Sequence, residues 1–297
     1  MTITAQHRKF EEASAFRRVV LPALIVVIGL VVMLYPVISS NWNNIAQQKV
    51  AQEYEDLIQD ADPVALNEAI EAAHEYNRTQ VQGPILDPWL VHVNTDNDEY
   101  RAYTEQLAGQ PAMSQVVIPT INSRLPVYHG TKADTLQKGL GHLYGTALPV
   151  GGDSTHSVIT GHTGITNATL WDNLIKVKEG DAIYVSTFGE RLKYEVHDIE
   201  VVLPHETDSI GKVSGEDLLT LITCTPYGIN THRLLVHAHR VEMDPDDGKV
   251  FESAGFQMQW WMWLVLAVAG LVLAGLVWWI LRTLRNNKVT VENEELA

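Results

Sequence analysis

The stretch Leu218-Leu-Thr-Leu-Ile-Thr-Cys-Thr-Pro-Tyr-Gly-Ile-Asn-Thr-His-Arg-Leu-Leu-Val236 decides how the fold is interpreted. β-Branched and aliphatic residues alternate over 218–225, which predicts a strand. Proline, glycine and asparagine within 226–230 then indicate a turn, and a second strand starts at Arg233. If the two strands pair in antiparallel fashion, Cys224 and Arg233 lie side by side. A thiol would then stand next to a permanent cation that has five fixed hydrogen-bond donors.

Residues from about 116 to 241 have the pattern of an all-β domain. Short β-forming runs alternate with glycine, proline and aspartate turns at the spacing of a closed barrel. We therefore predict a mainly β fold, a closed barrel with short helices. The expected strands are Val116–Ile118, Leu125–Tyr128, Ser157–Thr160, Ala182–Val185, Leu192–Val196, His197–Leu203 and the two around Cys224, with one short helix near Leu170–Leu174.

Two apolar runs without a charged residue flank this domain, at residues 19–38 and 260–281. Each has about the 20 residues that a helix needs to span a bilayer. A cleaved signal peptide is the alternative for the first run, but the run is long for a signal peptide and no clear Ala-x-Ala site follows it. We therefore expect one transmembrane helix at each end of the chain.

Charged residues beside these runs predict how the chain crosses the membrane. Basic residues lie on the outer sides of the two runs, and few lie on the inner sides. The positive-inside rule then places both termini in the cytoplasm and residues of about 40–258 outside the cell. The basic residues are Arg8, Lys9, Arg17 and Arg18 before the first run and Arg282, Arg285 and Lys288 after the second.

The remaining segments are helices, loops and a linker. Apolar residues at helical spacing over 41–58, and Asp62 followed by Pro63 as a helix start, predict two helices outside the membrane. Glycines and prolines without a sustained period predict an irregular loop over 80–112. The expected parts are a cytoplasmic N-terminus 1–18, a transmembrane helix 19–38, a helical region 39–79, a loop segment 80–112, the barrel 113–242, a linker 243–259, a transmembrane helix 260–281 and a cytoplasmic tail 282–297.

Charge and cysteine content exclude some functions. A formal net charge of −15 argues against nucleic acid as a partner. The single cysteine, Cys224, cannot form a disulfide within the chain. In an exported protein such a thiol pairs between chains, reacts, or is buried and inert.

Histidines near the predicted strand ends are candidates to assist the thiol. His162 follows the predicted strand 157–160 and is bracketed by glycines, where a barrel presents functional side chains. An ordinary loop histidine is the alternative. His237-Ala-His239 places two imidazoles on one strand face, but no third ligand is evident, so we predict neither a metal site nor a cofactor.

Several motifs in a fixed order point to a known family. Residues 220–233 combine Thr-x-x-Thr-Cys with an arginine nine positions after the cysteine, and this resembles the active-site signature of sortases. Other segments resemble the pilus-assembling class C sortases of Gram-positive bacteria, in which two membrane spans are usual. They are Asp87-Pro-Trp89, Leu125-Pro-Val-Tyr-His-Gly-Thr131, Gly141-His-Leu-Tyr-Gly-Thr146, Leu148-Pro-Val-Gly-Gly152 and Ser154-Thr-His-Ser-Val-Ile-Thr-Gly-His162.

The resemblance implies roles for three residues. Cys224 is the expected nucleophile, His162 the general acid and base, and Arg233 the donor that holds the oxyanion or the substrate. A membrane-anchored cysteine transpeptidase is implied, which cleaves a Leu-Pro-x-Thr-Gly-like signal between Thr and Gly through a thioester. The resolving nucleophile is then a lysine amine on the next pilin. No third residue that orients His162 is predicted.

The resemblance also implies a lid. Asp87 is expected to pair with Arg233, and Trp89 to cover Cys224; an ordinary Asp-Pro turn is the alternative. One departure from the family pattern is Thr163, which stands where a basic residue often follows the histidine.

Other functions stay open at this point. A housekeeping-type sortase would transfer the acyl group to a cell-wall precursor amine instead of a pilin. A non-catalytic membrane-anchored scaffold would not need Cys224, and a simple cysteine protease would transfer the acyl group to water alone.

Overall fold

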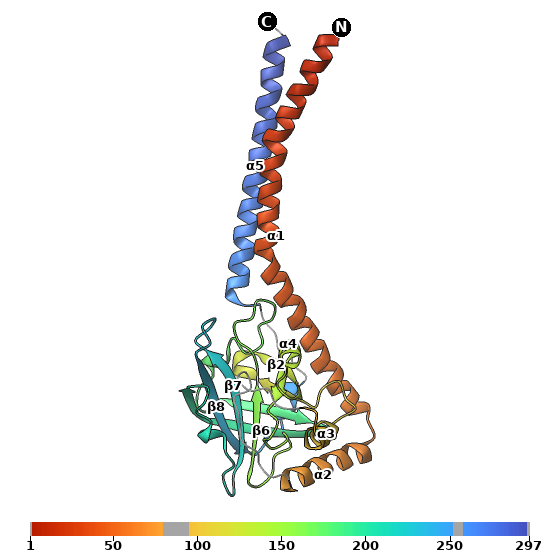
Figure 1. Ribbon diagram of the computed structural model, residues 1–297, viewed down its shortest axis with the longest axis vertical. Coiled ribbons are helices and arrows are strands. Elements are labelled where there is room, and N and C mark those ends of the chain that lie inside the picture. The colour runs from red at the N-terminus through yellow and green to blue at the C-terminus, as the bar shows by residue number, and fades with distance from the viewer. Residues whose placement is uncertain (1, 80–94, 252–257, 296–297) are drawn as a thin grey trace. The chain divides into compact units, whose positions relative to one another are not determined.

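A computed structural model (Figure 1) describes the backbone of residues 2–79, 95–251 and 258–295, and the side chains of 17–79, 95–251 and 258–286. The chain divides into two compact units, residues 1–39 with 258–297 and residues 40–257. Helix α1 (Thr2–Asp60) contributes to both units, and α5 (Trp260–Glu295) belongs to the first.

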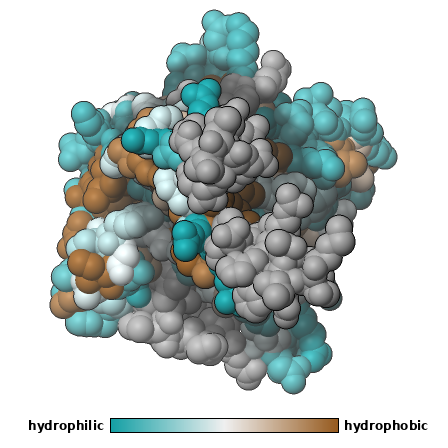
Figure 2. All heavy atoms as spheres, turned by 90° about the horizontal axis from the view of Figure 1, so that it is seen from above, coloured by the Kyte–Doolittle hydropathy of each residue, from teal (hydrophilic) through white to brown (hydrophobic). Residues whose placement is uncertain are grey.

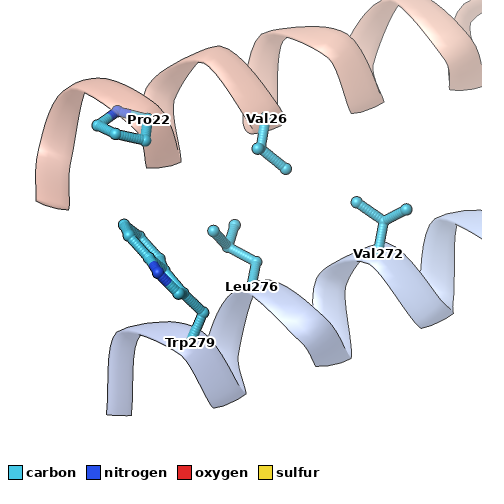
Figure 3. Close-up of a pocket in the computed structure, with 5 residues that line it drawn as sticks. All are labelled: Pro22, Val26, Val272, Leu276 and Trp279. Carbon is cyan, nitrogen blue, oxygen red and sulfur yellow. The ribbon is translucent and has the colours of Figure 1, made fainter. Parts of the chain in front are cut away.

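The first unit contains the apolar segments of α1 and α5. The most apolar 18-residue windows of α1 and α5 have mean hydropathies of 2.7 and 2.6, so both helices are able to cross a membrane by length and composition. Inside this unit the two helices face each other across an apolar pocket of about 290 Å³ (Figure 3). The pocket is lined by Pro22, Val26, Val272, Leu276 and Trp279.

Helices of the second unit follow the predicted pattern with two differences. α2 (Pro63–Thr79) starts as predicted, and Asp62 Oδ1 accepts from the backbone of Val64 at 3.0 Å. The helix predicted over 41–58 is continuous with the apolar one in α1, because no turn signal separates them. α3 (Asp98–Glu105) lies within the predicted loop; Asn97 caps it by accepting from Tyr100 N at 2.7 Å.

The described residues form a closed barrel of eight strands, and the closure was predicted from the sequence. The strand order is β1-β2-β3-β4-β7-β8-β6-β5. The pairs β2–β3 and β4–β7 are parallel and the other pairs are antiparallel. The strands are β1 (Ser114–Ile118), β2 (Ser123–His129), β3 (Leu140–His142), β4 (Thr155–Thr160), β5 (Ala182–Thr187), β6 (Glu190–Val202), β7 (Asp217–Thr225) and β8 (His232–Val241). The helix α4 (Ala133–Lys138) connects β2 to β3.

Three details of the barrel differ from the prediction. The two strands expected over 192–203 are one strand, β6, whose register with β8 shifts between Val196 and Asp198. β3 has three residues and was not predicted, because so short a run carries no period. The short helix expected near Leu170 is a series of turns followed by the 3-10 helix η2 (Leu174–Lys176).

Alternation along the strands separates an inner core from an outer layer. Leu219 and Leu221 of β7 and Val236 of β8 belong to the main core, which Tyr54 of α1 and Tyr103 of α3 also join. The outward residues next to them form a second cluster, made of Leu143, Val158, Ile210, Ile222 and Leu235. On the face shown in Figure 2, hydrophilic residues make up much of the outline, and hydrophobic residues show in smaller patches.

Candidate active site

Neighbouring strands of the barrel carry the thiol and the guanidinium. Cys224 is the last but one residue of β7, and Arg233 is the second residue of β8. The two are Cα partners in the antiparallel register, so the predicted pairing is confirmed. Residues directly opposite on paired strands have Cβ atoms about 4.5–5.5 Å apart. The cysteine and the arginine are therefore next to each other at one end of the barrel.

His162 reaches the same end from the other side of β7. β4 runs parallel to β7, with Thr160 opposite Ile222. The pairing continues past the end of β4, because Gly161 N donates to Ile222 O at 3.1 Å and Thr223 Oγ1 donates to Gly161 O at 2.7 Å. One further step in this register brings His162 level with Cys224. β4, β7 and β8 thus bring the three predicted residues to one edge of the barrel.

The loops that follow the histidine and the cysteine touch each other. Gly164 has a φ of +72°, and a Cβ built on it would lie 3.1 Å from the backbone nitrogen of Gly228, in the β7–β8 turn. A side chain at position 164 would therefore be strained and crowded. Glycine at this position allows the His162 loop to approach the turn between Cys224 and Arg233.

Burial and hydrogen bonds fix the electrostatics of the site. The relative exposure of Cys224 is 7% and that of Arg233 is 5%. Arg233 Nη1 donates to Asn230 O at 3.3 Å and to His232 O at 3.2 Å, so carbonyl groups of the β7–β8 turn hold the guanidinium. Burial lowers the pKa of the half-buried His162 below its ordinary value of 6.5. The imidazole is thereby biased toward its neutral form at neutral pH.

Asp172 secures the loop that carries His162. Its Oδ1 accepts from Thr163 Oγ1 at 3.1 Å and from Gly164 N at 2.8 Å, and Trp171 N donates to His162 O at 3.1 Å. Burial raises the pKa of Asp172 to about 6, and these two hydrogen bonds oppose the rise. Sequence analysis did not single out Asp172, because its contact with the histidine loop depends on how residues 163–172 fold back. Thr163, the departure from the family pattern, serves here as a donor to this carboxylate.

Helix α1 holds the next part of the same loop. Asn44 Nδ2 donates to Thr169 Oγ1 at 2.8 Å, and Thr169 N donates to Asn44 Oδ1 at 3.0 Å. Asn43 Nδ2 donates to the carbonyl of Asn167 at 2.6 Å, and Ser40 adds a hydrogen bond to the carbonyl of residue 166. The histidine loop is thus bound to a helix more than 100 positions earlier in the sequence.

The predicted lid residues, Asp87 and Trp89, lie outside the described residues. Their expected contacts with Arg233 and Cys224 therefore stay predictions.

Comparison with known proteins decides the family. Residues 116–241 match the Sortase domain. The solved structure of sortase C-1 from Actinomyces oris (formerly Actinomyces naeslundii) is 55% identical, with a TM-score of 0.58; the match covers 60% of this chain and 99% of that one. The chain belongs to the sortase family. The assignment as a sortase and the sortase-type barrel, both predicted from the sequence, are confirmed.

Other solved sortases match over much of their length. Sortase A from Corynebacterium diphtheriae is 52% identical over 71% of this chain and 100% of that one, with a TM-score of 0.62. Streptococcus pneumoniae sortase C is 39% identical over 66% of this chain and 97% of that one, with a TM-score of 0.60. The neighbours named sortase C confirm the resemblance to class C. Against one curated relative, 28% identical over 131 residues, the chain spans about half (52%) of that protein's length.

Proposed function

We propose that Cys224, His162 and Arg233 form the active site of a cysteine transpeptidase that polymerises pilin subunits. The observation that carries the proposal is the strand order β4–β7–β8, with Cys224 opposite Arg233 and His162 on the other side. Three different chemical groups thus meet where each could contact one peptide bond. A buried cysteine with no chemical role would not need an arginine and a histidine beside it.

The first half-reaction forms a thioester. The Cys224 thiol gives its proton to His162, and the thiolate attacks the Thr carbonyl carbon of a Leu-Pro-x-Thr-Gly-like signal. As the C–N bond breaks, His162 passes the proton to the leaving glycine amine. A histidine whose pKa is lowered is suited to this role, because it starts neutral and accepts the thiol proton.

Negative charge develops on the carbonyl oxygen during this attack, and Arg233 is placed to stabilise it. Carbonyl groups of the adjacent turn already orient its guanidinium, so little reorganisation is needed when the charge appears. Loss of one such donor typically costs about 3–4 kcal/mol of transition-state stabilisation.

The second half-reaction transfers the acyl group to an amine. A lysine Nζ of the next pilin attacks the thioester carbon, the C–S bond breaks, and His162 takes up the proton that the amine loses. An isopeptide bond forms, and His162 passes the proton to the departing thiolate, which regenerates the thiol. The similarity to sortases named sortase C supports a pilin as the acceptor, over the cell-wall precursor of a housekeeping-type enzyme.

Mass spectrometry of the full chain with a sorting-signal peptide tests the chemistry. We expect a peptidyl adduct on Cys224, with release of the glycine fragment, and no adduct in Cys224→Ala. A wild-type protein that releases the fragment without the adduct, or never releases it, contradicts the proposed nucleophile. Assembly that continues in Cys224→Ala would favour a scaffold.

The acceptor is tested separately with purified pilin. Polymerisation predicts a ladder of covalent multimers, whereas transfer only to a cell-wall precursor analogue indicates the housekeeping function. Hydrolysis without transfer to any added amine indicates a protease.

We further propose that α1 and α5 anchor the enzyme in the cell membrane. Their apolar windows, and the basic residues outside them, favour cytoplasmic termini with the barrel outside the cell. Protease treatment of intact cells tests this: the barrel should be cleaved while a C-terminal tag stays protected.

The proposed lid is tested through the accessibility of the thiol. Asp87→Ala and Trp89→Ala should each speed alkylation of Cys224 if these residues close the site. Unchanged alkylation rates in both variants would remove the lid from the proposal.

A further inference from the structure

A chain of polar side chains crosses the outer layer of four adjacent strands. His156 of β4 hydrogen bonds to Thr220 of β7 (Nε2 to Oγ1, 2.6 Å), and Thr220 hydrogen bonds to His237 of β8 (Oγ1 to Nδ1, 2.8 Å). His237 Nε2 lies 3.1 Å from Glu200 Oε1 on β6. At the other end, His156 Nδ1 lies 2.8 Å from Gly211 O. All three middle residues are buried, and the relative exposure of His237 is 6%.

These four contacts need four hydrogens, and the neutral groups provide three. Each neutral imidazole has one N–H and Thr220 has one O–H, while the Gly211 carbonyl and the Glu200 carboxylate have none. Burial lowers the pKa of His156 to about 4, so this ring stays neutral at neutral pH. His156 then donates from Nδ1 to Gly211 O and accepts from Thr220 at Nε2. The missing hydrogen is consequently at the other end of the chain.

Thr220 can therefore only accept from His237, through Nδ1–H. The Nε2 lone pair of a neutral His237 then points at the carboxylate of Glu200, and two acceptors face each other at 3.1 Å. Such a contact is stable only when a positive charge lies between or beside the two atoms. This charge is either a proton or a metal ion.

A second carboxylate, that of Asp198, lies close to His237 and Glu200. Asp198 is the cross-strand partner of His237, next to the register shift in β6. The ligand atoms of Asp198, Glu200 and His237 all lie within 4.8 Å of one another. Two ligands at about 2.0–2.1 Å from a tetrahedral Zn²⁺ are roughly 3.3 Å apart, close to the distance between His237 and Glu200.

We propose that Asp198, Glu200 and His237 bind a divalent transition-metal ion of the Zn²⁺ type. His237 would coordinate through Nε2, while Nδ1–H donates to Thr220 and fixes the ring, as the neighbours of metal-bound imidazoles do. A buried imidazole suits zinc and is a poor ligand for Ca²⁺ or Mg²⁺, which prefer oxygen. The site goes beyond the proposed transpeptidase chemistry and does not depend on it.

Sequence analysis identified one of the three proposed ligands, His237. His237-Ala-His239 suggested metal ligands on one strand, but the predicted absence of a third ligand argued against a site. The structure brings the carboxylates from β6, about 40 positions earlier in the chain. His239 lies beside His197, with their Nδ1 atoms 3.4 Å apart, and the His197 ring centroid is 6.4 Å from that of His237.

Zinc titration of the full chain in detergent tests the proposal. After removal of metal with a chelator, calorimetry at pH 7.5 should detect one tight equivalent of Zn²⁺. Substituting Co²⁺ should give the visible absorption bands of a low-coordinate site with a nitrogen ligand. Glu200→Gln and Asp198→Asn should each weaken Zn²⁺ binding by tenfold or more, because each removes a ligand. Thr220→Val should weaken it by about 10–100-fold, because Thr220 orients the His237 ring.

His205→Gln is the matched control, because His205 is exposed and lies in the segment between β6 and β7. It should bind Zn²⁺ as the wild type does. Zinc affinity that is unchanged in both carboxylate variants places the metal elsewhere and overturns the proposal. The proposal is also overturned if the protein does not bind Zn²⁺ and nitrogen-15 spectra show His237 as an imidazolium. The positive charge between His237 and Glu200 would then be a proton.

Discussion

Asn44 on α1 and Thr169 in the loop after His162 hold each other through two hydrogen bonds. The amide of Asn44 donates to the Thr169 hydroxyl at 2.8 Å and accepts from the Thr169 backbone at 3.0 Å. The relative exposure is 4% for Asn44 and 8% for Thr169, so water has little access to these two hydrogen bonds. The segment of α1 that follows its apolar part is therefore joined to the loop that positions the proposed general acid and base.

Asn44→Ala should slow acyl transfer by about tenfold or more, because small displacements of a catalytic group have large effects on rate. The variant also leaves a buried backbone N–H unsatisfied, which costs about 1–3 kcal/mol of folding stability. Steady-state assays with a sorting-signal peptide should show a lower kcat and a nearly unchanged KM. Glu53→Ala, an exposed change on the same helix, should have little effect. Wild-type kcat in Asn44→Ala would show that the contact is only structural.

Asp172 should act as a positioning residue for His162. Asp172→Ala removes the acceptor for Thr163 and Gly164 and should lower kcat by about 10–100-fold. Asp172→Asn keeps one oxygen that can accept from both donors, so activity should largely return. An alanine variant as active as the asparagine variant would contradict this role.

The raised pKa of Asp172 also predicts a pH effect on folding. The folded state binds the proton more tightly than the unfolded chain, whose carboxyl has a pKa of 3.8. This residue's contribution therefore weakens as pH rises from about 4 to about 6. Asp172→Asn does not titrate, so its stability relative to the wild type should increase across this interval. Thermal midpoints at several pH values measure the difference; parallel curves would contradict it.

Arg233→Lys should retain the positive charge and lose the planar donor geometry. We expect kcat/KM to fall by about 10²–10³-fold, the range for loss of an oxyanion donor. Arg240→Lys, farther along the same strand, is the control and should stay near wild-type activity. Peptide cleavage by the two variants measures the effect, and equal activities would exclude Arg233 from the reaction.

Acid should destabilise the barrel through His142. This ring is fully buried, with Nε2 2.8 Å from Ala147 O and Nδ1 2.9 Å from Tyr103 Oη, and burial lowers its pKa to about 4. The unfolded chain takes up a proton near pH 6.5, so folding stability should fall as pH decreases from about 6.5 to about 4. The loss of folding stability is at most roughly 3 kcal/mol, because each unit of difference between the unfolded and folded pKa of His142 corresponds to about 1.36 kcal/mol. His142→Asn should flatten the thermal midpoint over this interval, although it lowers stability at pH 8.

Local patterns were sufficient for much of the architecture. Alternating residues over 218–225 predict β7, and the turn after it predicts the pairing of Cys224 with Arg233, because short antiparallel connections leave few registers. The apolar windows of α1 and α5 were also visible, since a membrane-length run is a local property. The single strand β6 was predicted as two, because the irregular register between Val196 and Asp198 interrupts the period.

What the sequence determined by itself is the barrel, the family and the three residues proposed for catalysis, because each depends on neighbours in the chain or on motifs in a fixed order. What the tertiary structure decided is which distant groups surround those residues. Asp172 and Asn44 reach the histidine loop, and Asp198 and Glu200 reach His237, through strand order and packing. Contacts between residues far apart in the chain leave no local period, so only the folded barrel brings them together.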